Sequence, residues 1–380
     1  MFIEKLSNQI DIEKLLKKLD VDSGGLKILQ DKAELHILHI KDLPVGGANI
    51  LKQDALSIGA DLAVPRGTVI AKTPRVDTLL IATTKHLKTL AKKELAQPFG
   101  LKELAQQLQK ILKSDRHNNR EIMGVINAND DSFFSESRFS SQTAMHKIEQ
   151  MIEEGATIID IGGVSSAPNT KAVTPEVELA RVKPICDMIQ KQQLYKKVRF
   201  SIDSYEPLVV GYALASGFAI VNDIKGLQSD AVCQLCSEYD ATAIIMHMQG
   251  EPQTMQLNPH YDNVLSEVYD FFTQRIEKAE RFGIKDIILD VGIGFGKRLE
   301  DNLSLLRNLE HFQSLGKELL VGASRKSMID KIVPTRVEDR LPATLALHHE
   351  ALRNGANILR VHDVAEHYSL LKMFEALEQV

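Results

Sequence analysis

The sequence contains no tryptophan and only three cysteines in 380 residues. Cys233 and Cys236 form a CxxC pair without a second pair, so we interpret them as residues packed inside a helix and not as a zinc or redox site. No apolar run approaches the roughly 18–20 residues of a membrane span. The first twenty residues mix acids and bases on a helical pattern, unlike a signal peptide. Few cysteines and no export signal predict a cytoplasmic protein.

Charge of either sign is also limited. Lys and Arg number 46 against 51 Asp and Glu, which gives a net charge of −5. This balance argues against nonspecific binding to nucleic acid, and we expect no membrane partner. With 44% hydrophobic and 26% charged residues, the chain has the composition of a globular protein that is long enough for more than one domain.

A polar stretch at 113–121, KSDRHNNRE, separates two differently patterned regions. We expect residues 1–115 to form a small α+β domain of unknown role, because no motif with recognisable chemistry occurs there. Its expected elements are a helix near 10–19, strands near 34–40, 67–71 and 77–82, and helices near 84–95 and 100–113. The glycines of the intervening segment stand where turns are expected.

Residues 116–380 alternate short apolar strands with amphipathic helices. The strands read EIMGVIN, ATIIDIGG, VRFSID, FAIVND, TAIIMH, DIILD, LLVGAS and NILRVH. Eight such units in about 260 residues match a closed (β/α)8 TIM barrel in number and length. An open doubly wound sheet is the alternative, but it more often has five or six strands.

Polar residues concentrate at the carboxyl ends of these strands. They are Asn127; Ser165 and Ser166; Asp203; Asn222 and Asp223; His247; Asp290; Ser324, Arg325 and Lys326; and Arg360, His362 and Asp363. Any one of them could be a helix cap. All eight strands ending in this way predict an active site, since barrel enzymes build their sites at this face.

The segment 287–297, IILDVGIGFGK, runs from an apolar strand through Asp290 into a glycine-rich turn. Its glycine spacing fits neither the Walker loop nor the dinucleotide fingerprint. A tight turn explains the glycines but does not explain why the strand ends on a carboxylate.

The chemistry of these strand ends suggests a ligand class. Asp203 and Asp290 with Asn222 suit a flat heterocycle that has N–H donors and a carbonyl group. Arg360, His362 and either Arg325 or Lys326 could bind a phosphate or diphosphate. Asn127 could help hold a water-rich Mg²⁺ ion. The residues thus favour a planar N-heterocycle that carries an anionic leaving group.

From about Glu121 to the C-terminus the chain resembles dihydropteroate synthase. The matching segments are IMGVINANDDSFF, GATIIDIGGVSSAPNT, FSIDSY, IVNDIKGL, MHMQGEPQTMQ, DIILDVGIGFGK, LLVGASRKS and ILRVHDV, in the order that the family has. The resemblance implies a transferase of folate biosynthesis that joins a dihydropterin diphosphate to p-aminobenzoate and releases pyrophosphate. As partners we expect these two substrates and a second copy of the chain in a homodimer.

The resemblance also implies roles for individual residues. The pterin would contact Asp203, Asn222, Met246, Asp290, Gly294, Phe295 and Lys326, and the diphosphate would contact Asn127, Arg360 and His362. Ser166, Pro168 and Ser324 would frame p-aminobenzoate, and Asn127 would be the ligand of Mg²⁺. Catalysis would rest on Asn127, Lys326, Arg360 and His362, without a protein nucleophile.

Two loops depart from the family pattern. The first, at 127–133, lacks the usual Thr-Pro, and the second has Ala167 where the family has an arginine near the diphosphate. Losing one charge-assisted contact costs about 1.5–3 kcal/mol. Arg138 or Lys171 could replace it.

Two alternatives stay open at this point. A methyltetrahydrofolate:corrinoid methyltransferase would share the pterin-facing carboxylates but has no need for the cationic cluster of Ser324–Ser327 and Arg360–His362. A non-catalytic or regulatory pterin-binding relative would explain Ala167 and the altered first loop. Such a binder should gain no affinity from pyrophosphate and magnesium.

Overall fold

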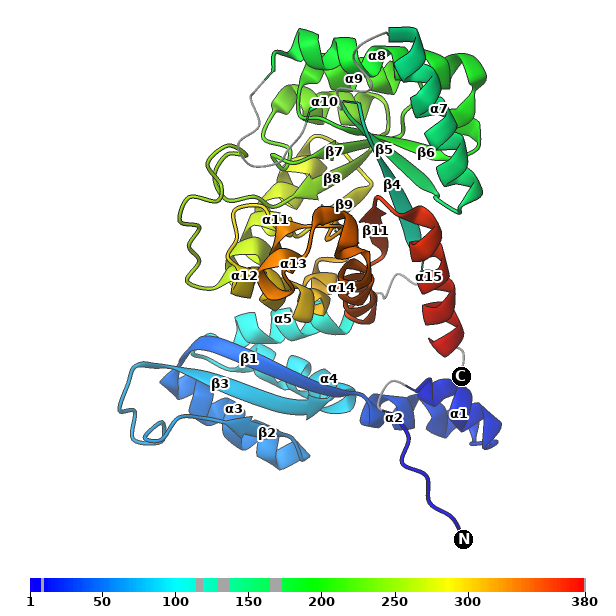
Figure 1. The fold of residues 1–380 in the computed structure, drawn as a ribbon. Helices are drawn as coiled ribbons and strands as arrows, with labels where there is room; N and C mark the ends of the chain where they lie inside the picture. Colours follow the sequence, from blue (N-terminus) through cyan, green and yellow to red (C-terminus); the bar gives the residue numbers. More distant parts are fainter. Residues whose placement is uncertain (8–9, 114–118, 129–136, 165–172, 379–380) are drawn as a thin grey trace. The chain divides into compact units, whose positions relative to one another are not determined.

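The computed structural model describes residues 1–7, 10–113, 119–128, 137–164 and 173–378, with side chains from residue 142 onward in the helix that starts at Ser137. The chain divides into two compact units. One consists of Met1–Asp115 with Glu375–Val380, and the other of Arg116–Phe374 (Figure 1). No helix within the described ranges is long and apolar enough to cross a membrane.

The second unit is a closed barrel of eight parallel strands, which confirms the predicted (β/α)8 fold. Around the barrel the strands follow the order β10-β11-β4-β5-β6-β7-β8-β9. Their bounds are β4 (Glu121–Asn127), β5 (Ile158–Gly162), β6 (Arg199–Asp203), β7 (Ile220–Asp223), β8 (Thr242–Met246), β9 (Ile287–Asp290), β10 (Glu318–Val321) and β11 (Ile358–Val361). Every strand that the sequence predicted for this region is present.

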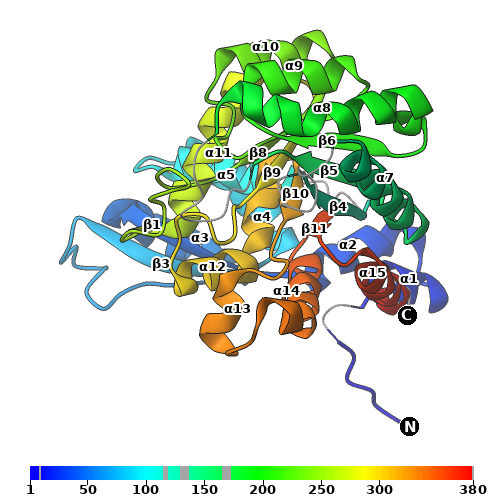
Figure 2. The same cartoon turned by 45° about the horizontal axis from the view of Figure 1, so that its top comes forward.

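Helices surround the barrel, and Figure 2 shows α8, α9 and α10 along one side of it. The helices are α7 (Ser137–Glu153), α8 (Pro175–Gln192), α9 (Pro207–Ala215), α10 (Asp230–Glu238), α11 (Val264–Arg281), α12 (Leu299–Arg307), α13 (Ser327–Ile332), α14 (Leu341–Arg353) and α15 (Val364–Glu378). Short 3₁₀ helices span Leu194–Lys196, Leu309–Leu315 and Val337–Arg340. Cys233 and Cys236 are free and buried in α10, as predicted.

The barrel interior is filled by side chains in layers. One layer consists of Met123, Ile158, Ile220, Ile244, Ile288, Leu320 and Ile358, all buried and packed together. Apolar residues that face outward from the same strands pack against the helices in a separate, larger cluster. Burial on both sides explains why the strands read as nearly continuous apolar runs. The apolar layer closes the barrel beneath whatever lies at the carboxyl ends of the strands.

The first unit combines a three-stranded antiparallel sheet with helices. Its elements are α1 (Ile12–Lys18), α2 (Ser23–Ala33), β1 (Leu35–Pro44), α3 (Val45–Ile58), β2 (Asp61–Ala63), β3 (Arg75–Thr83), α4 (Thr84–Lys93), a 3₁₀ helix (Glu94–Ala96) and α5 (Leu101–Lys113). The strand order is β1-β3-β2. Burial alternates along β3, so one face of the sheet packs on the core of this unit.

The sequence misplaced one strand in this unit and overlooked two helices. Residues 67–71 form turns, with Val69 and Ile70 78% and 79% exposed, so the predicted strand there is wrong; β2 lies earlier in the chain. Helix α2 begins next to a glycine pair because Asp22 caps it, accepting a hydrogen bond from Gly24 N.

Helix α3 was overlooked because its first turn contains glycines, which the sequence analysis interpreted as turn residues. A Cβ at Gly47, in the first turn of α3, would lie 2.6 Å from the carbonyl oxygen of Phe99. The glycine therefore permits close packing inside a helix, whereas the sequence pattern indicated a turn.

Candidate active site

A polar layer lies two residues beyond the apolar layer along the barrel strands. Side chains at i and i+2 point to the same face of a strand. Asp160, Asn222, Asp290 and Arg360 each follow an apolar-layer residue at this spacing, and the apolar Met246 does so on β8. The inward-facing position that follows the apolar layer is therefore occupied by carboxylates, an amide and a cation, and these side chains lie at the barrel mouth.

One carboxylate joins three strands. Asp160 Oδ2 on β5 accepts hydrogen bonds from Asn222 Nδ2 on β7, at 3.1 Å, and from Arg360 Nε on β11, at 2.7 Å. Arg360 Nη2 also donates to Asp203 Oδ2 on β6, at 2.6 Å. The guanidinium is therefore held by two carboxylates, and among the described residues Nη1 has no hydrogen-bond partner.

Several acceptors in this layer have no hydrogen-bond partner. Within the described residues these are Asn222 Oδ1, Asp160 Oδ1 and Ser201 Oγ, all inaccessible to solvent. An unpaired buried acceptor costs about 1–3 kcal/mol. Native structures leave few such atoms, and a bound water, ion or ligand is one explanation for them. The layer is thus prepared for a ligand that brings N–H donors.

Burial shifts the protonation equilibria of this layer. It raises the pKa of Asp203 to about 7, against the opposing attraction of Arg360. It also raises the pKa of Asp290, partly offset by the hydrogen bond from Gly292 N. Burial together with the nearby Arg360 lowers the pKa of Lys326 to about 8. Perturbed pKa values of this kind, gathered in one mouth, are typical of an active site.

The glycine-rich turn after β9 is held by close backbone contacts. Gly292 and Gly296 have φ angles of 66° and 58°, in the left-handed region. A Cβ at these positions would lie 1.9 Å from His247 O and 2.2 Å from Gln249 O. The turn therefore requires glycine so that the loops after β8 and β9 can touch.

Lys297 is the buried centre of these two loops. Its Nζ donates to the carbonyl oxygens of His247, Gly292 and Phe295 at 3.0–3.1 Å and lies 3.0 Å from His247 Nδ1. Burial lowers its pKa to about 7. The lysine points into its own loop, which confirms that this turn is no Walker-type phosphate loop.

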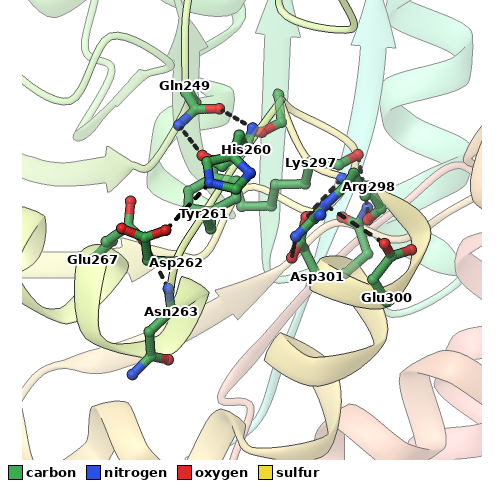
Figure 3. Close-up of polar contacts among 12 residues, drawn as sticks. Gln249, His260, Tyr261, Asp262, Asn263, Glu267, Lys297, Arg298, Glu300 and Asp301 are labelled. Atoms are coloured by element: carbon green, nitrogen blue, oxygen red, sulfur yellow. Dashed lines mark hydrogen bonds and ion pairs between the residues drawn. The ribbon is translucent and has the colours of Figure 1, made fainter. Parts of the chain in front are cut away.

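Further contacts tie the same loops together, and Figure 3 shows them around Lys297. Gln249 and His260 exchange two hydrogen bonds at 2.8 and 3.0 Å. Tyr261 OH donates to Gly296 O at 2.8 Å. Arg298 and Asp301 form an ion pair at the start of α12. These contacts give the turn that follows Asp290 a fixed shape.

An apolar cluster lies beside the polar layer. It consists of Ile224, Met246, Met255 and Phe295, with Tyr205 and Met248 packed against it. Lys326 Nζ lies 4.2 Å from the centre of the Phe295 ring. The Cβ that Gly294 lacks would contact the Lys326 side chain at 3.4 Å. A flat ligand could place its edge on the polar layer and its face on this cluster.

The turns after β10 and β11 are linked side by side. Ser324 Oγ lies 2.9 Å from His362 Nδ1. Arg325 donates to both carboxylate oxygens of Asp363, at 3.0 and 2.5 Å. Arg325 is thus engaged structurally, which leaves Lys326 as the cation of this turn that faces the polar layer.

The structure brings most of the predicted residues together. Asp203, Asn222, Met246, Asp290, Gly294, Phe295, Ser324, Lys326, Arg360 and His362 all lie at the carboxyl-terminal mouth of the barrel. Asn127 ends β4 there, in register with Gly162 of β5. Ser166 and Pro168 lie outside the described residues, as does the Ala167 position.

The sequence reasoning missed two buried residues of this site. Asp160 was overlooked because it lies inside β5 instead of at its end, although its spacing from Ile158 marks the inward face. Lys297 was overlooked because the segment 287–297 was compared only with phosphate-binding loops.

No metal site is preformed in the described ranges. There, no group of three or more His, Cys, Asp and Glu side chains could hold a metal ion. Asn127 supplies one amide side chain at the mouth. A cation bound mainly by water and substrate phosphates needs few protein ligands, so the residues present fit Mg²⁺ only in that form.

Residues 123–362 match the family of pterin-binding enzymes. The chain is 42% identical, over all of its length and all of the relative's, to a bifunctional dihydropteroate synthase/dihydropteroate reductase of Helicobacter pylori. It is 40% identical to the dihydropteroate synthase of Haemophilus influenzae, over 67% of this chain and 93% of that protein.

Solved structures give the same result. The dihydropteroate synthase of Clostridium difficile, determined in the presence of pteroic acid, has a TM-score of 0.63 and 36% identity, covering 69% of this chain and 98% of that one. The enzyme of Thermus thermophilus in complex with 4-aminobenzoate has a TM-score of 0.62 and 32% identity, covering 68% and 95%. With its barrel, its site and these relatives, the chain belongs to the dihydropteroate synthase family of pterin-binding enzymes.

Proposed function

We propose that the barrel mouth binds a dihydropterin diphosphate and transfers its pterin-methyl group to p-aminobenzoate. The observation that carries this proposal is Asn222 Oδ1, buried and without a partner among the described residues, next to Asp160 and Asp203 in the barrel mouth. An aminopyrimidine edge offers the N–H donors that such acceptors need. The apolar cluster with Met246 and Phe295 would cover the ring face, and Gly294 would let Lys326 approach it.

The diphosphate would lie on the cationic side of the mouth. Arg360 has Nη1 left for a phosphate oxygen, and Lys326 carries a proton at pH 7 because its pKa is about 8. His362 and Asn127, at the ends of β11 and β4, would complete this subsite. A Mg²⁺ ion held by Asn127 and the diphosphate would supply further positive charge for the leaving group.

The reaction needs no nucleophile from the protein. The bond between the pterin methylene carbon and the diphosphate oxygen breaks, and its electron pair leaves with pyrophosphate. The arylamine nitrogen forms the new bond to that carbon and then loses a proton. The side chains of the mouth would orient the two substrates and stabilise the departing charge.

p-Aminobenzoate would enter from the turn after β10. Ser324 is fixed there by His362, so its hydroxyl is a positioned contact for the second substrate. Ser166 and Pro168 stay predictions for the same subsite. Arg138 and Lys171 stay predictions for replacing the charge that is missing at Ala167.

A second activity is favoured by the full-length match to the bifunctional relative. That relative is named as a reductase as well, and the match includes residues 1–115, which the single-function synthases lack. We propose that the full chain also reduces dihydropteroate. Reduction adds a hydride to C6 and a proton to N5 of the ring, so a hydride donor such as a reduced nicotinamide or flavin must be supplied.

The deciding experiment for the synthase is product formation by the purified chain with dihydropterin-CH₂-diphosphate, p-aminobenzoate and Mg²⁺. We expect dihydropteroate only when both substrates are present, and a strong dependence on Mg²⁺. Tight pterin binding without product would favour the non-catalytic pterin-binding alternative. Addition of a hydride donor after synthesis should yield tetrahydropteroate. If neither a reduced nicotinamide nor a reduced flavin yields tetrahydropteroate, the second activity is contradicted.

We further propose that the active form is a homodimer. The support is the resemblance to the synthase family. Light scattering of the full chain during gel filtration tests it: a mass near twice 42.4 kDa is expected, and a monomer that is fully active contradicts it.

A further inference from the structure

Two histidines lie buried beneath the linked turns that follow β10 and β11. His348 belongs to α14 and His367 to α15, and both are 0% exposed. Neither belongs to the set of residues that would contact substrate. Above them, Ser324 meets His362 and Arg325 meets Asp363.

The two histidines form one continuous chain of hydrogen bonds between the turns. The backbone N–H of Ala323 donates to His348 Nε2 at 3.1 Å. His348 Nδ1 lies 2.8 Å from His367 Nε2, and His367 Nδ1 lies 2.6 Å from the carbonyl oxygen of Asp363. An amide can only donate and a carbonyl can only accept, so both ends of the chain fix its direction.

Only one arrangement of protons satisfies every member of this chain. His348 Nε2 must be bare, so neutral His348 carries its hydrogen on Nδ1 and donates to His367. His367 then carries its hydrogen on Nδ1 and donates to Asp363 O. Burial supports the neutral forms, because it lowers the pKa of both rings, that of His348 well below the ordinary value.

The turn after β10 needs such support because its backbone is strained. Arg325 has a φ angle of 56°, in the left-handed region that a side chain disfavours. Its N–H donates to Thr344 Oγ1 at 3.1 Å, one helical turn before His348 on α14. Two acceptors on one face of α14 thus hold Ala323 and Arg325, on either side of Ser324.

We propose that His348 and His367 are positioning residues of the synthase, which hold the turn at 323–326 against the turn at 362–363 through their hydrogen-bond chain. This inference rests on the proposed function. It assigns the two rings to the p-aminobenzoate side of the mouth, since Ser324 and His362 lie directly above them. Of the proposed pterin contacts only Lys326 belongs to the turn that the histidines hold, and the others come from β6 to β9 and the loop after β9.

The test compares His348→Leu, His348→Gln and the control His349→Leu. Leucine fills the space but leaves the Ala323 N–H without its acceptor and His367 Nε2 without its donor, whereas the glutamine amide can both accept and donate. His349 is the neighbouring residue on α14 and packs on Phe374 instead. We expect His348→Leu to raise the KM for p-aminobenzoate about tenfold, glutamine to restore most of that loss, and pterin affinity to stay within about twofold.

If His348→Leu only reduced the amount of folded protein, the apparent kcat would fall and the KM values for p-aminobenzoate and for the dihydropterin diphosphate would not change. That result would contradict the proposal. Equal KM values in His348→Leu and His349→Leu contradict it too. Should the wild type show no turnover, calorimetric binding of p-aminobenzoate replaces KM, so failure of the synthase activity is distinguished from failure of this inference.

A second measurement does not depend on any variant folding. Nitrogen NMR of the ¹⁵N-histidine-labelled wild type should show His348 as the Nδ1–H tautomer at neutral pH. An Nε2–H tautomer or an imidazolium at His348 overturns the proposal.

Discussion

Arg360 on β11 and Asp203 on β6 are 157 residues apart in the sequence, and their side chains meet at 2.6 Å in the barrel mouth. The same guanidinium binds Asp160 at 2.7 Å, so one cation balances two carboxylates. Sequence reasoning assigned Arg360 to the diphosphate and Asp203 to the pterin. Their contact couples the two subsites.

Replacement of Arg360 by alanine should therefore weaken the binding of free pterin as well as that of the diphosphate substrate. Removing one partner of a buried ion pair typically costs about 3–5 kcal/mol, because the remaining charge is unpaired. The pKa of Asp203 should also rise further, so that it becomes a neutral acid at pH 7. Calorimetry with free pterin and with the diphosphate substrate measures both affinities.

The division of roles inferred from the sequence predicts a different result for the same variant. Under that division free pterin binds normally and only the diphosphate substrate is lost. Arg360→Lys separates charge from geometry, since lysine keeps the charge but cannot bridge both carboxylates as the planar guanidinium does.

Asp290→Asn should weaken pterin binding by about 10- to 100-fold, since a charged acceptor contributes about 1.5–3 kcal/mol. The backbone bond from Gly292 N can persist, because the asparagine oxygen still accepts it. Fluorescence titration with a pterin provides the measurement, and Asp286→Asn, at an exposed position just before β9, is the matched control. Equal affinities of the two variants would remove Asp290 from the pocket.

Lys297→Met should loosen the loops after β8 and β9. Three buried carbonyl oxygens would lose their shared donor, while the methionine would still fill most of the space. We expect a lower melting temperature and weaker pterin binding, because the turn that follows Asp290 is no longer held. Lys285→Met, at an exposed lysine that pairs with Asp240, is the control. A variant that binds pterin normally would show that the loop needs no anchor.

Glu94 in the first unit should make that unit less stable as pH rises. Its side chain is buried beside Asp54. Burial, followed by the charge of Asp54 and a side-chain hydrogen bond with it, raises the pKa of Glu94 from 4.5 to about 7. The folded state thus disfavours the charged form. The destabilisation is absent below pH 4.5, grows between pH 4.5 and 7, and is constant above 7.

Glu94→Gln should remove this dependence. The amide carries no charge and can donate to the Asp54 carboxylate, as the protonated Glu94 does. We expect the variant to be more stable than the wild type at pH 8 and little different at pH 4.5. Thermal unfolding at both pH values measures this, with exposed Glu103→Gln as the control. A gain that is equal at both pH values would rule out the linkage.

The barrel could be read from the sequence because its signals are local. Each strand is a short apolar run that ends in a polar residue, and each helix has its own amphipathic spacing, so all eight units were recognisable. The first unit was harder. Gly24 and Gly47 lie in helices for reasons of capping and close packing, which neighbouring residues along the chain do not reveal.

The sequence by itself determined the fold of the barrel, the family and most of the residues at the mouth. Tertiary structure alone decided which of them meet. Asp160 accepts hydrogen bonds from both Asn222 and Arg360, and Lys297 points inward and donates to the backbone of its own loop. His348 and His367 join two turns from separate helices. These relations depend on closure of the barrel, which brings together residues as far apart in the chain as Asp160 and Arg360, 200 positions, and no local pattern encodes such contacts.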